Sequence, residues 1–280
     1  MIRLQDFLIL TKFKLSLTVT LSCLFSFILV SKGINSTIIL PLFAVLCLAL
    51  GVSALNQVQE HQEDSKMQRT KNRPVASKRI STKIGFILAL ILIAFSMLMI
   101  YQTLLIKGVL IFLFVIFLYN ILYTKGKKIT IYASVYGAIL GTIPPLIGWT
   151  IGGGKLLDIQ FIAIALFYFV WQIPHFWLLM LKHYKEYEKA GFPIIVNTFG
   201  IAPLERITFI WLLLTLITGL FTLAVFELNR TIFYLLILFN FYTLYGIIMF
   251  RLHLDYIKIF IQINVYITVV MLLLCLNVFL

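Results

Sequence analysis

The first group of side chains that could perform chemistry follows the second apolar stretch of the chain. Asn56, Glu60 and Asp64 are four residues apart, so they share one face of a helix that continues past that stretch. An amide and two carboxylates offer the oxygen ligands that Mg²⁺ prefers. Arg69 and Arg73 come next, and guanidinium groups bind phosphate oxygens in a fixed geometry. The pattern predicts a metal and diphosphate site with the first three residues as metal ligands; a solvated loop without chemistry is the alternative.

A second group lies at and beyond the end of the sixth apolar stretch. Gln172, His175, Lys182 and Glu186 fall on roughly one helical face, at steps of three, seven and four, and His183 lies beside them. Polar groups at membrane depth are costly and are candidate functional residues. Two alternatives remain open: the histidine is a core residue bonded to a neighbouring helix, and the tryptophans around it form an interfacial belt.

A third stretch closes the fourth apolar segment and reads Tyr119-Asn120-Ile-Leu-Tyr123-Thr124-Lys125-Gly-Lys127-Lys128-Ile-Thr130. Glycines at 137, 141 and 148 follow in the fifth segment. Glycine allows close approach of helices inside a membrane, so packing is the favoured role of these glycines.

The elements that must position these groups are apolar segments. Of the 280 residues, 62% are hydrophobic and only 12% are charged, too few charges to cover a soluble fold of this size. The sequence therefore predicts an all-α, polytopic membrane protein in a lipid bilayer, with one transmembrane domain over residues 1–280. The net charge of +13 indicates loop charges that orient the chain, not nucleic-acid binding. Nine spans are expected at about 14–31, 37–56, 84–101, 106–123, 132–150, 157–181, 207–226, 231–250 and 259–280.

The basic residues are distributed unevenly between alternate loops. Nineteen lie on one side of the predicted membrane, and four lie on the other: Lys32, Lys107, Lys155 and Arg230. This bias predicts a cytoplasmic N-terminus and an outer C-terminus, with the long loops and the active site in the cytoplasm. Only about a dozen residues precede the first span, which favours the plasma (inner) membrane of a bacterium.

Taken together, the three stretches resemble the protoheme IX farnesyltransferases (haem O synthases), a branch of the UbiA-type intramembrane prenyltransferases. The first signature of that branch is Asn-x3-Asp/Glu-x3-Asp-x2-Met-x-Arg-Thr-x2-Arg-Pro. This chain supplies it in register with Asn56, Glu60, Asp64, Met67, Arg69, Thr70, Arg73 and Pro74. Further matches are Trp171-Gln172-x-Pro174-His175-Phe176-Trp177, Tyr187-x2-Ala190-Gly191-x-Pro193, Tyr123-Thr124-Lys125 and Gly141-x2-Pro144-Pro145-Leu146-x-Gly148-Trp149. A weaker match, Leu10-Thr11-Lys12, has Phe13 where proline is usual.

The resemblance implies a UbiA-type helical bundle in which the farnesyl group of farnesyl diphosphate is transferred to haem B, giving haem O. It implies Mg²⁺ as cofactor and a downstream haem A synthase as a candidate partner. The residues expected to hold the metal and neutralise the diphosphate are Asn56, Glu60, Asp64, Arg69, Arg73, Lys125 and Lys182. The residues expected to handle the haem are Gln172, His175, His183 and Glu186.

Two other functions fit part of the pattern. A prenyltransferase acting on a quinone precursor needs the same metal and diphosphate site, but not the Trp-Gln-x-Pro-His-Phe-Trp string. A small transporter predicts inverted repeats and polar groups near the membrane centre, whereas the polar groups here gather at one side.

Overall fold

A computed structural model describes residues 3–280, and in that range every regular element is helical. Long apolar runs form helices in a membrane because a helix satisfies all of its own backbone hydrogen bonds. The longer helices are α2 (Phe13–Ser31), α3 (Ile39–Gln59), α5 (Thr82–Ile116), α7 (Ala133–Ile151), α8 (Ile159–Lys189), α10 (Ile201–Ala224), α11 (Arg230–His253) and α12 (Tyr256–Asn277). The shorter ones are α1 (Leu4–Leu10), η1 (Ser36–Ile38), α4 (His61–Lys66), the π-helix η2 (Phe117–Tyr123), α6 (Thr124–Gly126) and α9 (Ile195–Phe199).

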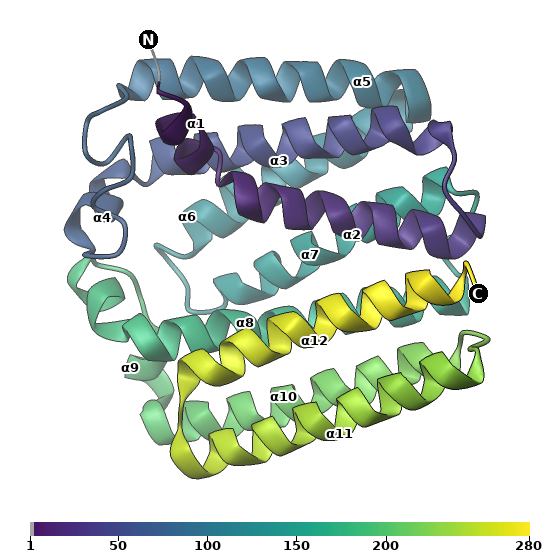
Figure 1. Cartoon of the computed structure of the whole chain (residues 1–280). Helices are drawn as coiled ribbons and strands as arrows, with labels where there is room; N and C mark the ends of the chain where they lie inside the picture. The colour runs from purple at the N-terminus through teal and green to yellow at the C-terminus, as the bar shows by residue number, and fades with distance from the viewer. Residues whose placement is uncertain (1–2) are drawn as a thin grey trace. The chain divides into compact units, whose positions relative to one another are not determined.

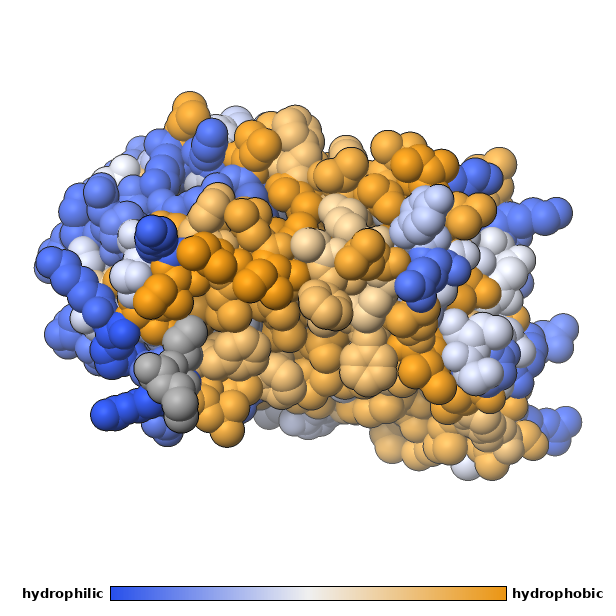
Figure 2. Space-filling view, turned by 90° about the horizontal axis from the view of Figure 1, so that it is seen from above, coloured by the Kyte–Doolittle hydropathy of each residue, from blue (hydrophilic) through white to orange (hydrophobic). Residues whose placement is uncertain are grey.

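Eight helical stretches in the described range are long and apolar enough to cross a membrane. Leucine, isoleucine and phenylalanine side chains of α5 are exposed along much of its length, among them Phe95 (60%) and Leu98 (63%). Figure 2 shows one face of the molecule, on which hydrophobic residues form a broad band with hydrophilic residues gathered at its ends. Such a surface is stable only against lipid, so the chain is a multi-pass membrane protein.

The predicted third and fourth spans occur within one helical stretch, Thr82–Gly126. Its 45 residues would extend about 67 Å if straight, more than twice the ~30 Å of a bilayer core. The stretch is broken at Leu105, whose φ of 51° and ψ of −144° are not helical. Figure 1 shows the chain reversing direction at the end of the upper part of α5. The spans predicted at 84–101 and 106–123 therefore share one of the eight stretches, on either side of the break at Leu105.

The contacts divide the chain into two compact units. Unit 1 comprises Met1–Leu24, Asn35–Leu140 and Lys185–Pro193, and unit 2 comprises Phe25–Ile34, Gly141–Tyr184 and Ile194–Leu280.

In unit 1, α3 packs closely along α5. A Cβ added at Gly51 would lie 2.8 Å from the Ile93 side chain and 3.1 Å from the Ala89 carbonyl oxygen, so only glycine allows this approach. The loop between α4 and α5 is part of the same core, because Val75 and Ile80 are buried against α3 and α5. This packing fixes the loop that contains the arginines of the first signature.

In unit 2, α10, α11 and α12 pack in succession. The fully buried Tyr266 of α12 donates a hydrogen bond to Asn240 of α11 at 2.7 Å, and its ring packs edge-on against Phe167 of α8. α8 continues to Lys189, beyond its predicted end at 181, but it is interrupted at His183, where φ is −115° and ψ is 16°. The division between the two units falls directly after this interruption, between Tyr184 and Lys185.

Candidate active site

The three predicted metal ligands come together although the helix that was expected to hold them is not continuous. α3 ends at Gln59, and Glu60 has non-helical angles before α4 begins. Two helix-like hydrogen bonds nevertheless cross this joint, from the Glu60 amide to the Asn56 carbonyl (3.0 Å) and from the Asp64 amide to the Glu60 carbonyl (2.8 Å). The four-residue register is therefore kept. Asn56, Glu60 and Asp64 are 1%, 4% and 1% exposed.

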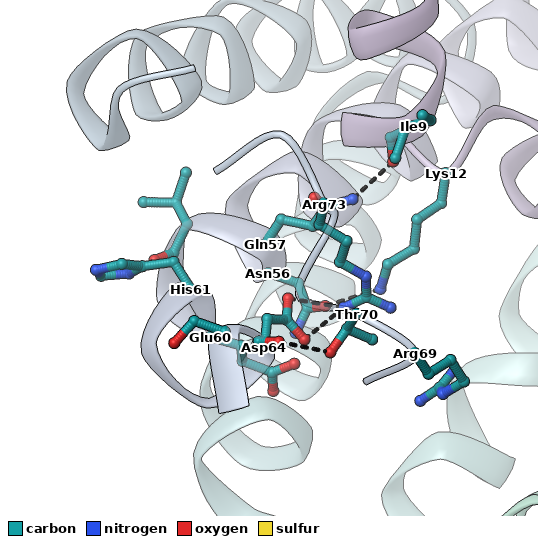
Figure 3. A network of polar contacts seen from close by, with 12 residues as sticks. Ile9, Lys12, Asn56, Gln57, Glu60, His61, Asp64, Arg69, Thr70 and Arg73 are labelled. Atoms are coloured by element: carbon teal, nitrogen blue, oxygen red, sulfur yellow. Dashed lines mark hydrogen bonds and ion pairs between the residues drawn. The ribbon is translucent and has the colours of Figure 1, made fainter. Parts of the chain in front are cut away.

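Each of these three side chains contacts one cation. The ammonium group of Lys12 donates to Asn56 Oδ1 at 2.8 Å, and that of Lys127 lies 2.7 Å from Glu60 Oε1. One guanidinium nitrogen of Arg73 donates to both carboxylate oxygens of Asp64 at 2.8 Å. Figure 3 shows Arg73 facing Asp64 while Lys12 extends toward Asn56. We call these six residues, Lys12, Asn56, Glu60, Asp64, Arg73 and Lys127, the carboxylate cluster.

Lys12 reaches the cluster through an unusual backbone conformation. It separates α1 from α2 with a φ of 48°, the left-handed region that residues other than glycine rarely adopt. A second contact joins the end of α1 to α3 beside Lys12. The Gln57 side chain donates to the carbonyls of Ile9 and Leu10 at 2.6 and 3.1 Å. Burial, together with the nearby charges of Arg73 and Lys127, lowers the pKa of Lys12 to about 7. The cluster thus contains three basic side chains and only two carboxylates.

Lys127, two residues after the predicted Lys125, is the lysine of this stretch that belongs to the carboxylate cluster. Lys125 is exposed, whereas Lys127 pairs with Glu60. Burial alone would lower the pKa of Lys127, but the Glu60 carboxylate outweighs burial and raises the pKa above its usual range. Thr124, next to them, accepts a hydrogen bond from the Asn56 amide at 3.0 Å.

The other arginine of the signature, Arg69, is held away from the carboxylates. Its backbone amide donates to Glu186 Oε2 at 3.1 Å, and its guanidinium donates to the Tyr187 hydroxyl at 3.1 Å. Met67 packs beside this contact with Ala190 and Phe192. Glu186, which was predicted to handle haem, therefore binds the backbone of the arginine loop in this structure.

The donor set of the carboxylate cluster fits a hard divalent cation. It offers carboxylate and amide oxygens, and the adjacent Glu63 keeps one buried oxygen without a hydrogen-bond partner among the described residues. His61 points away from the cluster, and its ring contacts the Val58 carbonyl at 2.8 Å (Figure 3). Within residues 3–280, no three or more His, Cys, Asp or Glu side chains form a metal-binding group. A metal held here would therefore depend on Asn56 and on oxygens from a substrate.

The second predicted group has a different character. In unit 2, His175 Nδ1 lies 3.0 Å from the side-chain oxygen of Asn264 on α12. The imidazole ring also contacts the rings of Trp171 and Phe260, at 5.0 and 4.7 Å between centroids. Gln172 packs against Gly141, where an added Cβ would lie 2.5 Å from Gln172 Oε1. Gly141 thus has the predicted packing role, because its missing side chain leaves space for Gln172.

The predicted face of α8 does not extend past His183. The non-helical angles at that residue interrupt the periodicity on which the prediction depended. Lys182 is exposed, and Glu186 belongs to unit 1 with Arg69. Lys182 and His183 belong to unit 2 with Gln172 and His175, so Glu186 is the member of this group that is separated from the others.

Several residues of both regions were missed by the sequence analysis as site residues. Lys12 and Lys127 were not among the predicted site residues, although Lys12 belongs to the weak Leu10-Thr11-Lys12 match and Lys127 lies in the third stretch. Tyr119, which accepts a hydrogen bond from Lys12 at 3.2 Å, opens the third stretch but was not among the predicted site residues, and Asn264 gave no signal. Their partners lie 107 and 89 residues away in the chain, beyond any local periodicity.

Comparison with known proteins gives the same family along most of the chain. The model of the UbiA prenyltransferase family matches residues 19–258. The chain is 32% identical to a protoheme IX farnesyltransferase of Oleidesulfovibrio alaskensis over 183 residues, which are 65% of each protein. It is 36% identical to a protoheme IX farnesyltransferase of Ehrlichia chaffeensis over 213 residues, which cover 70% of this chain and 71% of that one. The matched region thus spans just under two thirds of the first relative.

Solved structures agree in fold. A structure of digeranylgeranylglyceryl phosphate synthase superposes with a TM-score of 0.76 at 14% identity, over 98% of both chains. A UbiA homologue from Archaeoglobus fulgidus, bound to GPP and Mg²⁺, gives a TM-score of 0.69 at 16% identity, again over 98% of both chains. The all-α bundle predicted from the sequence is confirmed.

Proposed function

This chain belongs to the UbiA prenyltransferase family, as its motifs predicted, and we propose that it transfers the farnesyl group of farnesyl diphosphate to a vinyl group of haem B, giving haem O. The observation that supports the donor half of this reaction is the buried carboxylate cluster. The protoheme IX farnesyltransferase relatives and the Trp171–Trp177 string support haem B as the acceptor.

Charge in the carboxylate cluster suits a metal diphosphate. Three cations, Lys12, Arg73 and Lys127, face only two carboxylates, and the lowered pKa of Lys12 reflects burial combined with this excess. A diphosphate with one Mg²⁺ has a net negative charge, so it relieves the excess. We propose that Asn56, Glu60 and Asp64 hold Mg²⁺ and that the cations bind the phosphate oxygens.

Bound Mg²⁺ would neutralise charge on the departing diphosphate. The chain's own cations would contribute to the same step, because Arg73 and Lys127 lie beside the carboxylates that are proposed to hold the metal. The farnesyl chain is apolar and would lie between spans, away from bulk water, where an allylic cation survives longer. The haem vinyl group then attacks the allylic carbon, and water completes the hydroxyethylfarnesyl group.

Assignment of the remaining predicted residues follows their positions. Arg69 and Glu186 brace the loop that contains Arg73, and Tyr187 lies with them. Lys125, Lys182 and His183 stay proposals as substrate contacts. Gln172 and His175 are proposed to face the haem.

We propose that the protein lies in a bacterial plasma membrane with its N-terminus and carboxylate cluster on the cytoplasmic side, and that a haem A synthase takes its product. The unequal distribution of basic residues supports this orientation. A reporter active only outside the cytoplasm should be active when fused after Leu280 and silent when fused within residues 66–80. The reverse pattern would overturn the orientation.

The reaction is tested by expressing the chain in cells that lack haem O, extracting the haem and measuring its mass. We expect a farnesylated haem, absent from cells that express Asp64→Ala. A prenylated quinone precursor without any change in haem would assign the protein to the other acceptor class.

A further inference from the structure

The orientation of His175 is fixed by one side chain of another helix. Asn264 of α12 uses its amide NH₂ group to donate to the carbonyl of Phe260, one turn earlier, at 2.5 Å. Its oxygen is therefore the atom that lies 3.0 Å from His175 Nδ1. An amide oxygen only accepts hydrogen bonds, so Nδ1 of the imidazole must be the protonated nitrogen.

This hydrogen bond determines what the other ring nitrogen can do. In a neutral imidazole that is protonated on Nδ1, Nε2 has a free lone pair. Such a nitrogen accepts a hydrogen bond or binds a metal, but it does not donate. The rings of Trp171 and Phe260 flank the imidazole and restrict its rotation about the Asn264 bond.

Two further polar atoms beside His175 are buried without a partner in the described part of the chain. They are the indole Nε1 of Trp171, a donor, and Oε1 of Gln172, an acceptor. Both residues lie within one helical turn of His175, and Gly141 leaves the room that Gln172 occupies. Buried polar groups are nearly always satisfied, and exceptions call for a reason such as a ligand.

From these contacts we infer that Asn264 is a positioning residue, which holds His175 with the Nε2 lone pair directed to the iron of the haem substrate. The inference rests on the proposed function, because it takes haem as the acceptor. It also chooses between two roles for His175. Donation of a hydrogen bond to a haem propionate needs a proton on Nε2, and the bond to Asn264 places that proton on Nδ1.

The protonation state is tested without haem and without turnover. Protein labelled with ¹⁵N at histidine is purified in detergent, and the ring nitrogens are observed by NMR. The chain has four histidines, so His175→Ala identifies the signals of His175. We expect Nδ1 protonated and Nε2 unprotonated in the wild type, and a mixture of the two forms in Asn264→Leu. A protonated Nε2 in the wild type would overturn the inference.

Iron binding is tested by titrating haem B into the same proteins and recording the absorption spectrum. His175→Ala should change the spectrum of bound haem, and Asn264→Leu should weaken binding roughly tenfold, as expected for loss of a group that orients a metal ligand. Asn264→Asp keeps an acceptor oxygen and should bind nearly as the wild type does. In a His175→Ala background, Asn264→Leu should have no further effect, because Asn264 acts through the histidine.

The matched control is Gln262→Leu. Gln262 is another amide on α12, and it donates to the Tyr242 carbonyl at 3.1 Å without touching His175. Its loss should leave haem binding unchanged. If Asn264→Leu does not accumulate in the membrane, Asn264→Ser takes its place. Serine is too short to make the same contact with His175, and it keeps a polar group at this position.

The outcomes separate this inference from the proposed function. Wild-type protein that makes haem O, but whose haem spectrum is the same in His175→Ala, would overturn iron binding while leaving the reaction intact. Wild-type protein that neither binds nor modifies haem would overturn the proposed function, and with it the iron ligand, even where NMR finds the Asn264 bond.

Discussion

The carboxylate cluster and the His175–Asn264 pair are built in opposite ways. In the cluster, charged groups contact one another at 2.7–2.8 Å with almost no exposure of the acids. Around His175 the contacts are one hydrogen bond between neutral groups and several aromatic rings. The first arrangement can exchange its ion pairs for a metal and a polyanion. The second can hold a flat, largely apolar molecule and direct one lone pair. We therefore expect the two proposed substrates to be recognised by separate sets of residues.

The largest effect is expected for Asp64→Ala, which removes a proposed metal ligand and the partner of Arg73. Turnover should fall by roughly a thousandfold or more, because charge stabilisation of the leaving group is lost. The measurement is turnover of purified protein supplied with Mg²⁺. Asp6→Asn is the matched control, since it breaks another Asp–Arg pair of unit 1, with Arg79 at 2.9 Å, outside the cluster. Near-normal turnover of Asp64→Ala would exclude Asp64 as a metal ligand.

The next prediction compares the affinities of two variants for the two substrates. Arg73→Ala should weaken binding of farnesyl diphosphate by about 10- to 150-fold, the value of a charge-assisted hydrogen bond of ~1.5–3 kcal/mol, and leave haem binding nearly intact. His175→Ala should do the opposite. The apparent affinity for each substrate is measured with the other saturating.

The two regions would lose their separate roles if His175→Ala kept haem affinity and lost diphosphate affinity. Survival of both affinities with lower turnover would make His175 a residue of the chemical step.

A third test compares two lysines that are two residues apart. Lys127→Ala removes the partner of buried Glu60 and should lower the affinity for farnesyl diphosphate roughly tenfold. Lys125→Ala changes an exposed side chain and should alter it by less than about twofold. Diphosphate affinity of both variants, measured side by side, is the readout. Equal losses would place Lys125 in the site as well, as the sequence predicted.

The smallest effect is expected for Gly141→Ala. The added Cβ would lie 2.5 Å from Gln172 Oε1, so that side chain must move, at a cost of about 1–3 kcal/mol. Haem affinity should fall severalfold while diphosphate affinity stays unchanged. Gly33→Ala is the control, because no atom lies within 4 Å of its added Cβ. A loss confined to diphosphate affinity would contradict the assignment of Gln172 to the haem side.

Local patterns in the sequence were sufficient for most of the fold. Apolar length predicted the spans, for example 132–150 for α7, because a membrane helix forms from its own residues whatever its neighbours are. The four-residue spacing of Asn56, Glu60 and Asp64 predicted their meeting correctly, since the i to i−4 hydrogen bonds persist through Glu60.

Tertiary structure decided what local patterns do not contain. The break at Leu105 and the interruption at His183 are single backbone conformations in otherwise uniform helical sequence. The first joins two predicted spans, 84–101 and 106–123, in one helical stretch with a kink between them. The second separated Glu186 from the face of Gln172.

The same limit applies to the partners of the site. Whether Lys125 or Lys127 reaches Glu60 depends on the π-helical turn before them and on a contact 67 residues distant. The choice of Asn264 as the partner of His175 depends on the packing of α12 beside α8, which joins residues 89 apart. The sequence by itself determined which chemistry is present, because residue types and short spacings are local. Only the tertiary structure decided which cation faces which acid and which nitrogen of His175 keeps its lone pair, because those are contacts between distant segments.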